Sequence, residues 1–279
     1  MPKHIYNDPK YYSENNALQY NFAMRMLRHL SFQKDSRVLD IGCGDGLITS
    51  EVARIVSDGC VIGTDISQKM VEHAATQYCS IPNIRFIQMD ASQNIFREQF
   101  DIITSFNCLH WVSDQHSALL GIAKAAVEGA QIALLLSHKK SLYHEVLDAL
   151  CSSDEWSLYF KDQKSARQFF SADFYRELLV ESGLDIISLN EEEMIYHFES
   201  KESVAAFFAA AGSQPTLLPS SKRSRFISEF SDAYTKNVKT RQDGAIPIAF
   251  WCLQIVARKP SLLPSVRPER ETQAFFAKL

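Results

Sequence analysis

The sequence predicts an α/β protein with a doubly wound, mostly parallel sheet and a helical lid. Short apolar segments of strand length alternate with helical segments through the first half of the chain. A glycine-rich turn follows the first strand directly, and acidic residues stand at the ends of the next two strands. Residues 141–170 and 191–245 interrupt the alternation, and we expect them to pack together over the carboxyl edge of the sheet.

Each element is predicted from its hydrophobic period and its flanking residues. The expected strands are Arg37–Ile41, Cys60–Asp65, Ile84–Gln88, Phe100–Phe106, 131–136, 184–188 and Ile246–Arg258. The expected helices are 14–30, 47–56, 67–78, 113–127, 171–182, 204–211 and 225–237. Ser67 is a suitable N-cap for the helix 67–78. Gly183 ends the helix 171–182. Because parallel sheets bind ligands at the carboxyl ends of their strands, we expect the functional residues to follow strands.

Composition excludes several classes of function. The 279 residues are 46% hydrophobic and 22% charged, which is typical of a globular protein. The net charge of −4 leaves no basic surplus, so we expect no nucleic-acid partner. No apolar run is long enough for a membrane span, and the first residues lack a signal peptide's apolar region, so we expect no membrane association and a cytoplasmic location. The six cysteines contain no C-x-x-C, which favours reduced thiols and no metal centre.

The sharpest motif is the stretch 38–46, VLDIGCGDG, in which a buried strand runs into alternate glycines and then a helix. Glycine adopts positive φ and lets a ligand approach the backbone closely. We therefore predict that a nucleotide-like cofactor lies across this turn. The alternative is a tight strand–helix turn that binds nothing.

Two cofactor classes compete for the turn. A dinucleotide site needs G-x-G-x-x-G and a helix N-terminus that attracts pyrophosphate. Here Leu47 stands where that pattern has glycine, and Asp45 would face the phosphates. A cationic sulfonium with an amino-acid tail suits this acidic turn better, and Asp40 could take its ammonium group or order water near it.

Two more carboxylates point to a nucleoside. Asp65 ends the second strand about twenty residues after the glycines, where a carboxylate can accept hydrogen bonds from both ribose hydroxyls. Asp90 follows the third strand, where it can accept from an adenine amine. Either one could instead be a solvated carboxylate at a strand end. Together with the glycines, they predict a nucleoside that carries no phosphate.

These motifs as a set resemble those of class I S-adenosylmethionine-dependent methyltransferases, over about residues 35–140. Residues 38–46 are similar to the first motif, 65–70 to the ribose-binding strand end, 89–91 to the adenine motif and 105–107 to the motif after strand four. The resemblance implies S-adenosylmethionine as cofactor and a Rossmann-like sheet of seven strands, with Ile246–Arg258 as the antiparallel one. It implies these cofactor-binding residues: Asp40, Gly42, Cys43, Gly44, Asp65, Ile66, Met70, Asp90, Ala91 and Asn107.

The implied organisation has five parts. Residues 1–36 form an N-terminal helical lid segment, 37–190 the S-adenosylmethionine-binding core and 191–245 a helical cap insertion. Residues 246–259 supply the closing strand, and the proline-containing stretch 260–279 is a tail.

A narrower resemblance concerns the methyl acceptor. Residues 109–114, LHWVSD, resemble the segment after strand four in trans-aconitate and juvenile hormone acid methyltransferases, and malonyl-carrier-protein methyltransferases share its tryptophan. Residues 15–19 resemble the N-S-L-Q opening of the juvenile hormone group, and the 191–245 insertion resembles its substrate cap. All three groups methylate a carboxylate. The usual K-P-G-G turn before strand five is replaced here by 127–130, VEGA, which alters a turn and not the chemistry.

We therefore expect methyl transfer to a small-molecule carboxylate with an apolar body. A carboxylate with a pKa of about 4 is ionised at neutral pH and needs no general base. Trp111 and Gln19 are candidates to position it, Gln19 by donating to a carboxylate oxygen, and Tyr11 and Tyr12 to close the entrance. An amine or phenol acceptor would instead need a base, for which His110 is the candidate. His110 and Trp111 are thus the candidate catalytic residues.

Other functions stay open at this point. Methylation of a malonyl carrier protein predicts a basic patch by the lid, which residues 222–225, KRSR, would supply. A non-catalytic cofactor-binding module is disfavoured by the intact strand-end acids, and a nicotinamide oxidoreductase by Leu47. The sequence carries no signal for oligomeric state.

Overall fold

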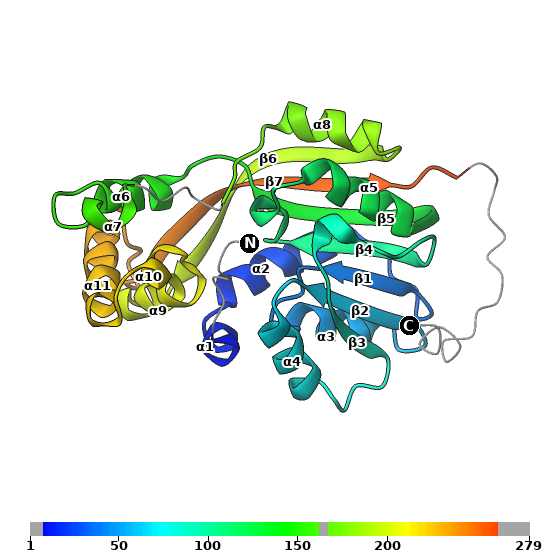
Figure 1. Ribbon diagram of the computed structural model, residues 1–279, viewed down its shortest axis with the longest axis horizontal. Helices are drawn as coiled ribbons and strands as arrows, with labels where there is room; N and C mark the ends of the chain where they lie inside the picture. The colour runs from blue at the N-terminus through cyan, green and yellow to red at the C-terminus, as the bar shows by residue number, and fades with distance from the viewer. Residues whose placement is uncertain (1–7, 162–166, 262–279) are drawn as a thin grey trace.

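The computed structural model describes residues 8–161 and 167–261, so most of the predicted tail lies outside the described residues. Within them, seven strands form one sheet in the order β3-β2-β1-β4-β5-β7-β6 (Figure 1). The strands are β1 Arg37–Ile41, β2 Cys60–Asp65, β3 Ile84–Gln88, β4 Phe100–Phe106, β5 Ala126–Ser137, β6 Asp185–Phe198 and β7 Ile246–Arg258. Only β7 runs antiparallel to its neighbours, β5 and β6, in this described sheet. The predicted fold class and the place of Ile246–Arg258 are confirmed.

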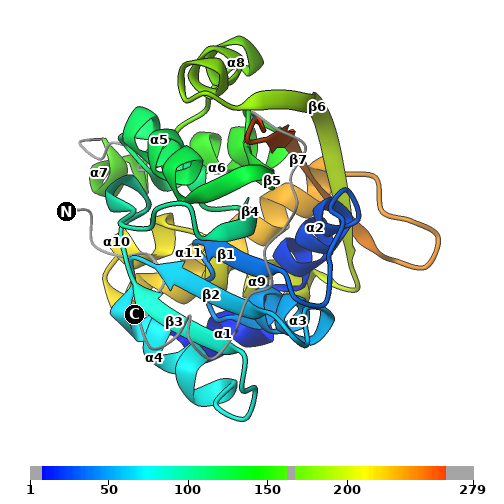
Figure 2. The ribbon, with the colours of Figure 1, turned by 90° about the vertical axis from the view of Figure 1, so that its right-hand side faces the viewer.

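Helices cover both faces of the sheet (Figure 2). Along β1, Val38 belongs to the apolar core that includes residues of helices α2 (Ala17–Leu27) and α3 (Leu47–Ile55). Its neighbour Leu39 belongs to the core on the other face, which includes residues of α5 (Gln115–Ala125) and α8 (Ala172–Glu181). Successive strand residues point to opposite faces, which explains this division. The remaining helices near the strand ends are α1 (Pro9–Glu14), α4 (Gln68–Gln77), η1 (Ala91–Gln93) and η2 (Leu109–Trp111). In the described parts of the chain, no helix is both long and apolar enough to cross a membrane.

The structure differs from the prediction at β6, which was expected over 184–188 and continues to Phe198. The first residues of the expected cap insertion, 191–198, are therefore strand. The reason lies in β7, whose thirteen residues would otherwise leave the backbone groups of one edge unpaired. β6 supplies them from Asp185, opposite Arg258, to Phe198, opposite Ile246.

The two segments that interrupt the alternation do pack together, at the end of the molecule where β6 and β7 extend beyond the other strands (Figure 1). The lid helices are α6 (Leu142–Cys151), α7 (Ser157–Phe160), α9 (Lys201–Ala211), α10 (Gln214–Leu217) and α11 (Ser220–Asn237). Aromatic rings join them: Tyr143 lies 5.0 Å from Phe230 and 5.0 Å from Phe250 between ring centroids, and Phe208 lies 4.1 Å from Phe230. This aromatic cluster fixes the lid to the sheet extension.

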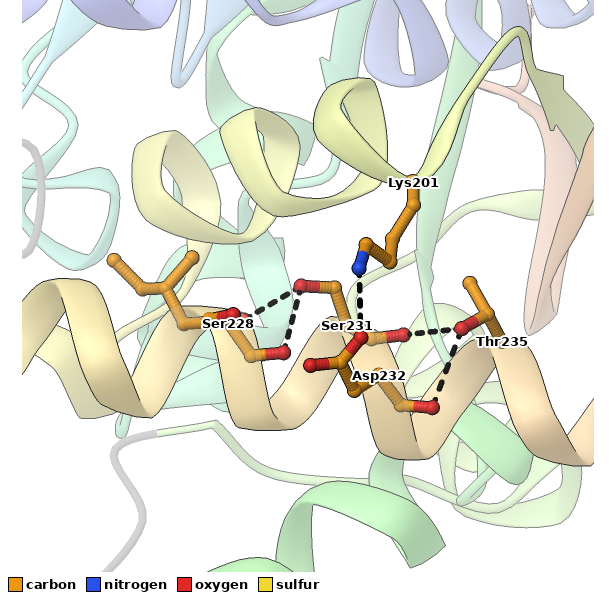
Figure 3. A network of polar contacts seen from close by, with 6 residues as sticks. Lys201, Ser228, Ser231, Asp232 and Thr235 are labelled. Carbon is orange, nitrogen blue, oxygen red and sulfur yellow. Dashed lines mark hydrogen bonds and ion pairs between the residues drawn. The ribbon is translucent and has the colours of Figure 1, made fainter.

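A polar contact also links α9 to α11 (Figure 3). Lys201 Nζ lies 2.8 Å from Asp232 Oδ1, and both side chains are nearly half exposed. Next to this pair, the hydroxyls of Ser231 and Thr235 donate to backbone carbonyls of their own helix. Exposed ion pairs contribute little because water screens them. The buried aromatic cluster therefore dominates the stability of the lid.

Candidate active site

A cavity of about 1540 Å³ lies between the carboxyl ends of the strands and the lid. Most of the predicted site residues line it: Tyr12, Gln19, Gly42, Cys43, Gly44, Asp65, Ile66, Met70, Asp90, Ala91, Asn107 and Trp111. Three predicted residues, Asp40, Tyr11 and His110, do not line it. The lid adds Phe160, Gln214 and Leu217, which sequence reasoning missed because no local motif marks them.

The glycine turn is held against the end of β2. The N–H groups of Gly42 and Cys43 donate to the Thr64 carbonyl at 2.7 and 2.9 Å. Gly42 has φ +77°, and a Cβ added there would overlap Cys108. Gly44 has φ +55°, and a Cβ there would meet only the Tyr12 ring, 3.8 Å away. Gly42 is thus needed for packing, whereas Gly44 keeps the backbone open to a ligand in the cavity.

Asp45 occupies the N-terminus of α3. Its Oδ1 accepts from the Leu47 N–H at 3.3 Å, and its Oδ2 accepts from Asn16 Nδ2 at 2.7 Å. A helix N-terminus attracts anions, and a carboxylate already there excludes a pyrophosphate from the same position. The structure therefore agrees with a cofactor that carries no phosphate. Asn16, which lies within the 15–19 motif, thus ties the start of α2 to this turn.

The two strand-end acids line the same cavity. Asp65 accepts from the N–H groups of Gly44 and Ser67 at 3.1 and 2.8 Å. Asp90 Oδ1 accepts from the backbone N–H and hydroxyl of Ser92 at 2.9 and 2.7 Å. Each carboxylate oxygen has two lone pairs, so these contacts leave acceptor capacity for hydroxyl and amine donors of a nucleoside.

Three buried polar atoms on the cavity residues have no hydrogen-bond partner among the described residues. They are Gln19 Oε1, Asn107 Nδ2 and Trp111 Nε1. Asn107 also has φ +57°, a conformation that few residues other than glycine adopt. An unsatisfied buried polar atom costs roughly 1–3 kcal/mol, and such sites are commonly functional. This arrangement fits a cavity whose ligands complete its hydrogen bonds.

Asp40 and Tyr11 were predicted to face the ligands, but neither lines the cavity. Asp40 is 3% exposed, and its two carboxylate oxygens accept from Thr49 Oγ1 at 2.6 Å and Thr104 Oγ1 at 2.9 Å. It therefore ties β1 to α3 and β4, and burial raises its pKa. Tyr11 lies on α1 with its side chain exposed, whereas the next residue, Tyr12, faces the cavity. Neighbours on a helix point in different directions, so only one of the pair could reach the site.

His110 is also placed away from the cavity, at 2% exposure. Its Nδ1 accepts from the Ser137 N–H at 3.2 Å, which assigns the ring proton to Nε2. Nε2 is itself buried. Burial, with Arg167 and His144 nearby, holds the pKa of His110 well below its usual value. A ring with its acceptor nitrogen occupied is not in position to take a proton from an acceptor in the cavity.

The basic cluster predicted to meet a carrier protein is engaged within the lid. Arg225 pairs with Glu155 at 2.6 Å and with Glu229 at 2.7 Å. Arg223 Nε donates to the Leu218 carbonyl at 3.0 Å. These partners neutralise the charge of Arg225 and hold the Arg223 side chain against the lid.

Known proteins resemble this chain in sequence. Residues 38–129 match a family described as "Methyltransferase domain". A candidate methyltransferase, 235L of Invertebrate iridescent virus 6, is 28% identical over 223 residues, which cover 80% of this chain and 83% of that protein. Trans-aconitate 2-methyltransferase of Methylobacterium radiotolerans is 26% identical over 86% of this chain and 93% of its own length. Juvenile hormone acid O-methyltransferase of Drosophila melanogaster is 29% identical over 53% of this chain and 57% of its own.

Solved structures share the fold. The YcgJ protein from Bacillus subtilis matches with a TM-score of 0.60 at 19% identity, covering 87% of this chain and 99% of that one. A candidate methyltransferase from Bacillus halodurans matches with a TM-score of 0.58 at 16% identity, and the match covers 85% of this chain and 98% of that one. The seven-stranded sheet is therefore a Rossmann-like methyltransferase fold.

Proposed function

Because the chain is a class I S-adenosylmethionine-dependent methyltransferase of small molecules, we propose that it methylates a carboxylate oxygen of an organic acid with an apolar body. The names of two relatives agree with an acid as acceptor, since trans-aconitate and juvenile hormone acid are both acids. The observation that carries the proposal is the buried, unpartnered indole N–H of Trp111 on a cavity wall that holds no histidine among its described residues.

The strand-end residues are assigned to the cofactor in this proposal. The backbone of Gly42 and Gly44 faces its amino-acid part, Asp65 accepts from the ribose hydroxyls, and Asp90 accepts from the adenine amine. Asn107 donates from its unpartnered amide nitrogen. When bound, S-adenosylmethionine supplies a methyl group already activated by the positive sulfur. The protein then needs to hold the acceptor in line and exclude water, and good alignment contributes about 7–11 kcal/mol in favourable systems.

The absence of a histidine from the described lining of the cavity suits a carboxylate acceptor. No histidine lines the described part of the cavity, and the ring of His110 is turned into the protein. An amine or phenol acceptor has to lose a proton, whereas a carboxylate of pKa about 4 is already ionised at neutral pH. The chain's own residues therefore need only to bind and orient the acid.

Trp111 and Gln19 are assigned to the acceptor. Both line the cavity, and both contain a buried polar atom without a partner. The Trp111 indole is a donor only, so it matches an oxygen acceptor such as a carboxylate. The Gln19 amide can present its NH₂ group to the same carboxylate, because the amide oxygen and nitrogen are interchangeable by a flip.

The remaining space fits an apolar body. Ligand pockets usually measure about 300–1,000 Å³, and this cavity of about 1540 Å³ has room for a cofactor and an acceptor together. Its lid side includes Phe160 and Leu217, which offer apolar surface to an acceptor chain. These walls would remove water from the carboxylate as it is bound.

The test uses the purified full chain, methyl-labelled S-adenosylmethionine and matched panels of acids, amines and phenols. The product is treated with alkali, and volatile labelled methanol is counted. We expect acids alone to give product, and alkali to release the label, because methyl esters hydrolyse. Label that is transferred but retained after alkali would overturn the carboxylate assignment and return His110 to consideration as a base.

A further inference from the structure

A second, smaller pocket of about 110 Å³ adjoins the main cavity, and helix α6 supplies part of its wall. The two spaces share four lining residues, which are Trp111, Asp148, Ser213 and Gln214. We call the smaller space the side pocket and define it by Trp111, Tyr143, His144, Leu147 and Phe169. A water molecule occupies about 30 Å³ in the liquid, so the side pocket has room for a short segment of a ligand.

The wall of the side pocket contains a hydrogen-bond donor without an acceptor. His144 is 8% exposed, and its Nδ1 accepts from the backbone N–H of Ser141 at 3.1 Å. Because a ring nitrogen that accepts carries no proton, the proton of the neutral imidazole is on Nε2. Nε2 is buried and has no hydrogen-bond partner among the described residues. A buried donor without an acceptor is costly, which points to a ligand atom with a lone pair at this place.

The surroundings of His144 keep its ring neutral and fix its direction. Burial, followed by Arg167 and Lys140, lowers the pKa of His144 to about 3. The rings of Phe169 and Phe250 meet the imidazole edge to face, with centroids 5.1 and 5.4 Å away. These rings pack against the imidazole, and the hydrogen bond to Nδ1 sets its rotation. The Nε2–H group is therefore an uncharged, oriented donor among apolar neighbours.

The charged side chains that line the side pocket have partners within the protein. Lys140 is paired with Asp148. Arg167 Nη1 donates to Ser137 Oγ at 2.8 Å, and the guanidinium lies 4.6 Å from the centroid of the Trp111 ring. A ligand anion would compete with these contacts, whereas an uncharged oxygen needs only the imidazole donor. The side pocket therefore favours a neutral acceptor atom, such as an ether or ketone oxygen.

We propose that the side pocket takes a segment of the acceptor's body that contains an uncharged oxygen, and that His144 selects this acceptor by donating to the oxygen from Nε2. The inference rests on the proposed function, because it concerns a second part of the molecule whose carboxylate is assigned to Trp111 and Gln19. The Trp111 N–H is assigned to that carboxylate alone. His144 thus distinguishes an oxygen-containing acid from a plain fatty acid of the same length.

The first test compares acids that differ in a single atom. Fatty acids from octanoate to dodecanoate are assayed on the full chain beside analogues in which one methylene group, at successive positions, is replaced by an ether oxygen. The value of kcat/KM is measured by labelled methanol release. We expect one position to raise kcat/KM roughly threefold to tenfold, the range of a single neutral hydrogen bond. Oxygen at the other positions should lower it, because a polar atom is then buried without a donor.

Two substitutions separate the donor at Nε2 from the contact at Nδ1. The shorter amide of His144→Asn has a polar atom near the place of Nδ1 and none at the place of Nε2. The longer amide of His144→Gln can put its NH₂ group where Nε2 was. We expect the preference for the ether acid to disappear in His144→Asn and to return in part in His144→Gln. His116→Asn makes the same change at an exposed histidine of α5 and should keep the wild-type preference.

The preference is a ratio of two substrates on one protein, so a general loss of stability or expression does not change it. The second test is binding without turnover. The ether acids and their plain counterparts are titrated calorimetrically into the wild type, His144→Asn and His116→Asn, with S-adenosylhomocysteine present. Tighter binding of one ether acid that is lost only in His144→Asn supports the side pocket.

The outcomes distinguish the two proposals. Methanol release without a preferred oxygen position, or a preference that His144→Asn keeps, overturns the side pocket and leaves carboxylate methylation in place. If no acid releases methanol but the binding preference depends on His144, the proposed carboxylate methylation fails and the side pocket stands. No binding of any acid would overturn both.

Discussion

The carboxylate of Asp65 accepts a hydrogen bond from the N–H of Gly44 across 3.1 Å, so the end of β2 and the glycine turn form one wall of the cavity. The same carboxylate accepts from the Ser67 N–H at the start of α4. Asp65 thereby joins the segments that follow the first two strands, at the point where a nucleoside ribose is assigned. Substitution of Asp65 therefore tests whether the cofactor ribose binds at this wall of the cavity.

We expect Asp65→Ala to weaken cofactor binding at least about tenfold, because it removes the acceptor for the ribose hydroxyls. The measurement is the Kd of S-adenosylhomocysteine by calorimetry. Asp154→Ala, at an exposed lid position, is the matched control and should bind as the wild type does. Unchanged affinity in Asp65→Ala would show that the cofactor is placed wrongly.

The two glycines of the turn should respond differently to alanine. Both substitutions place a residue with a side chain at positive φ, which costs about 1–2 kcal/mol. Gly42→Ala also drives a methyl group into Cys108, so it should lower the melting temperature further than Gly44→Ala does. Gly44→Ala adds its methyl group on the cavity side and should chiefly raise the Kd of the cofactor. Thermal unfolding and a cofactor titration on both variants separate the effects, and equal melting temperatures would contradict this assignment.

His110→Asn tests whether the reaction needs a base. With a carboxylate acceptor we expect kcat to change less than about threefold, because the ring lies outside the cavity and general-base removal usually costs about 10²–10⁴. When kcat of the wild type is measured against pH, it should then show no rise with a midpoint near pH 6.5. A loss of about a hundredfold in the variant, or such a midpoint in the wild type, would favour a base mechanism instead.

Stability should depend on pH through the buried histidines. Burial lowers the pKa of His144 to about 3 and holds that of His110 well below 6.5, so the unfolded chain binds more protons than the folded one below pH 6.5. Their contribution is complete above pH 6.5 and declines as pH falls below 6.5, by up to about 1.4 kcal/mol per pH unit for each ring. For His144 the decline continues to about pH 3. Asp40 and Asp45, whose pKa burial raises, act in the opposite direction.

The measurement is the free energy of unfolding in urea between about pH 7 and about pH 5, where ordinary carboxylates stay ionised. His144→Asn should reduce the slope of stability against pH. His116→Asn, which changes an exposed histidine on α5, is the control and should keep the wild-type slope. The same slope in both variants would mean that His144 is not buried as a neutral ring.

The local sequence determined the strands that bear the site. The bounds of β1 to β4 and β7 agree with their predictions, because each is a short apolar run with a clear stop. The predicted Ser67 cap is confirmed, with its side chain accepting from the Met70 N–H. The positions of the glycines and the strand-end acids could be predicted from the sequence, because parallel topology alone brings the strand ends to one edge of the sheet. The full length of β6 could not be predicted, because its acidic stretch 191–193 becomes strand only by pairing with β7, which is distant in sequence.

Tertiary packing decided which of the predicted side chains reach the cavity. His110 and Trp111 are adjacent in sequence, yet Trp111 lines the cavity and His110 is turned into the protein. In the same way, Tyr12 lines the cavity and Tyr11 does not. Asp40 accepts hydrogen bonds from two threonines of other elements instead of facing the cavity. A second pocket of about 110 Å³ brings Trp111 together with His144 and Arg167, which lie more than thirty residues away in sequence. Sequence determines which chemical groups are present, but the direction of a side chain depends on what packs against it from distant segments, and no local pattern records that.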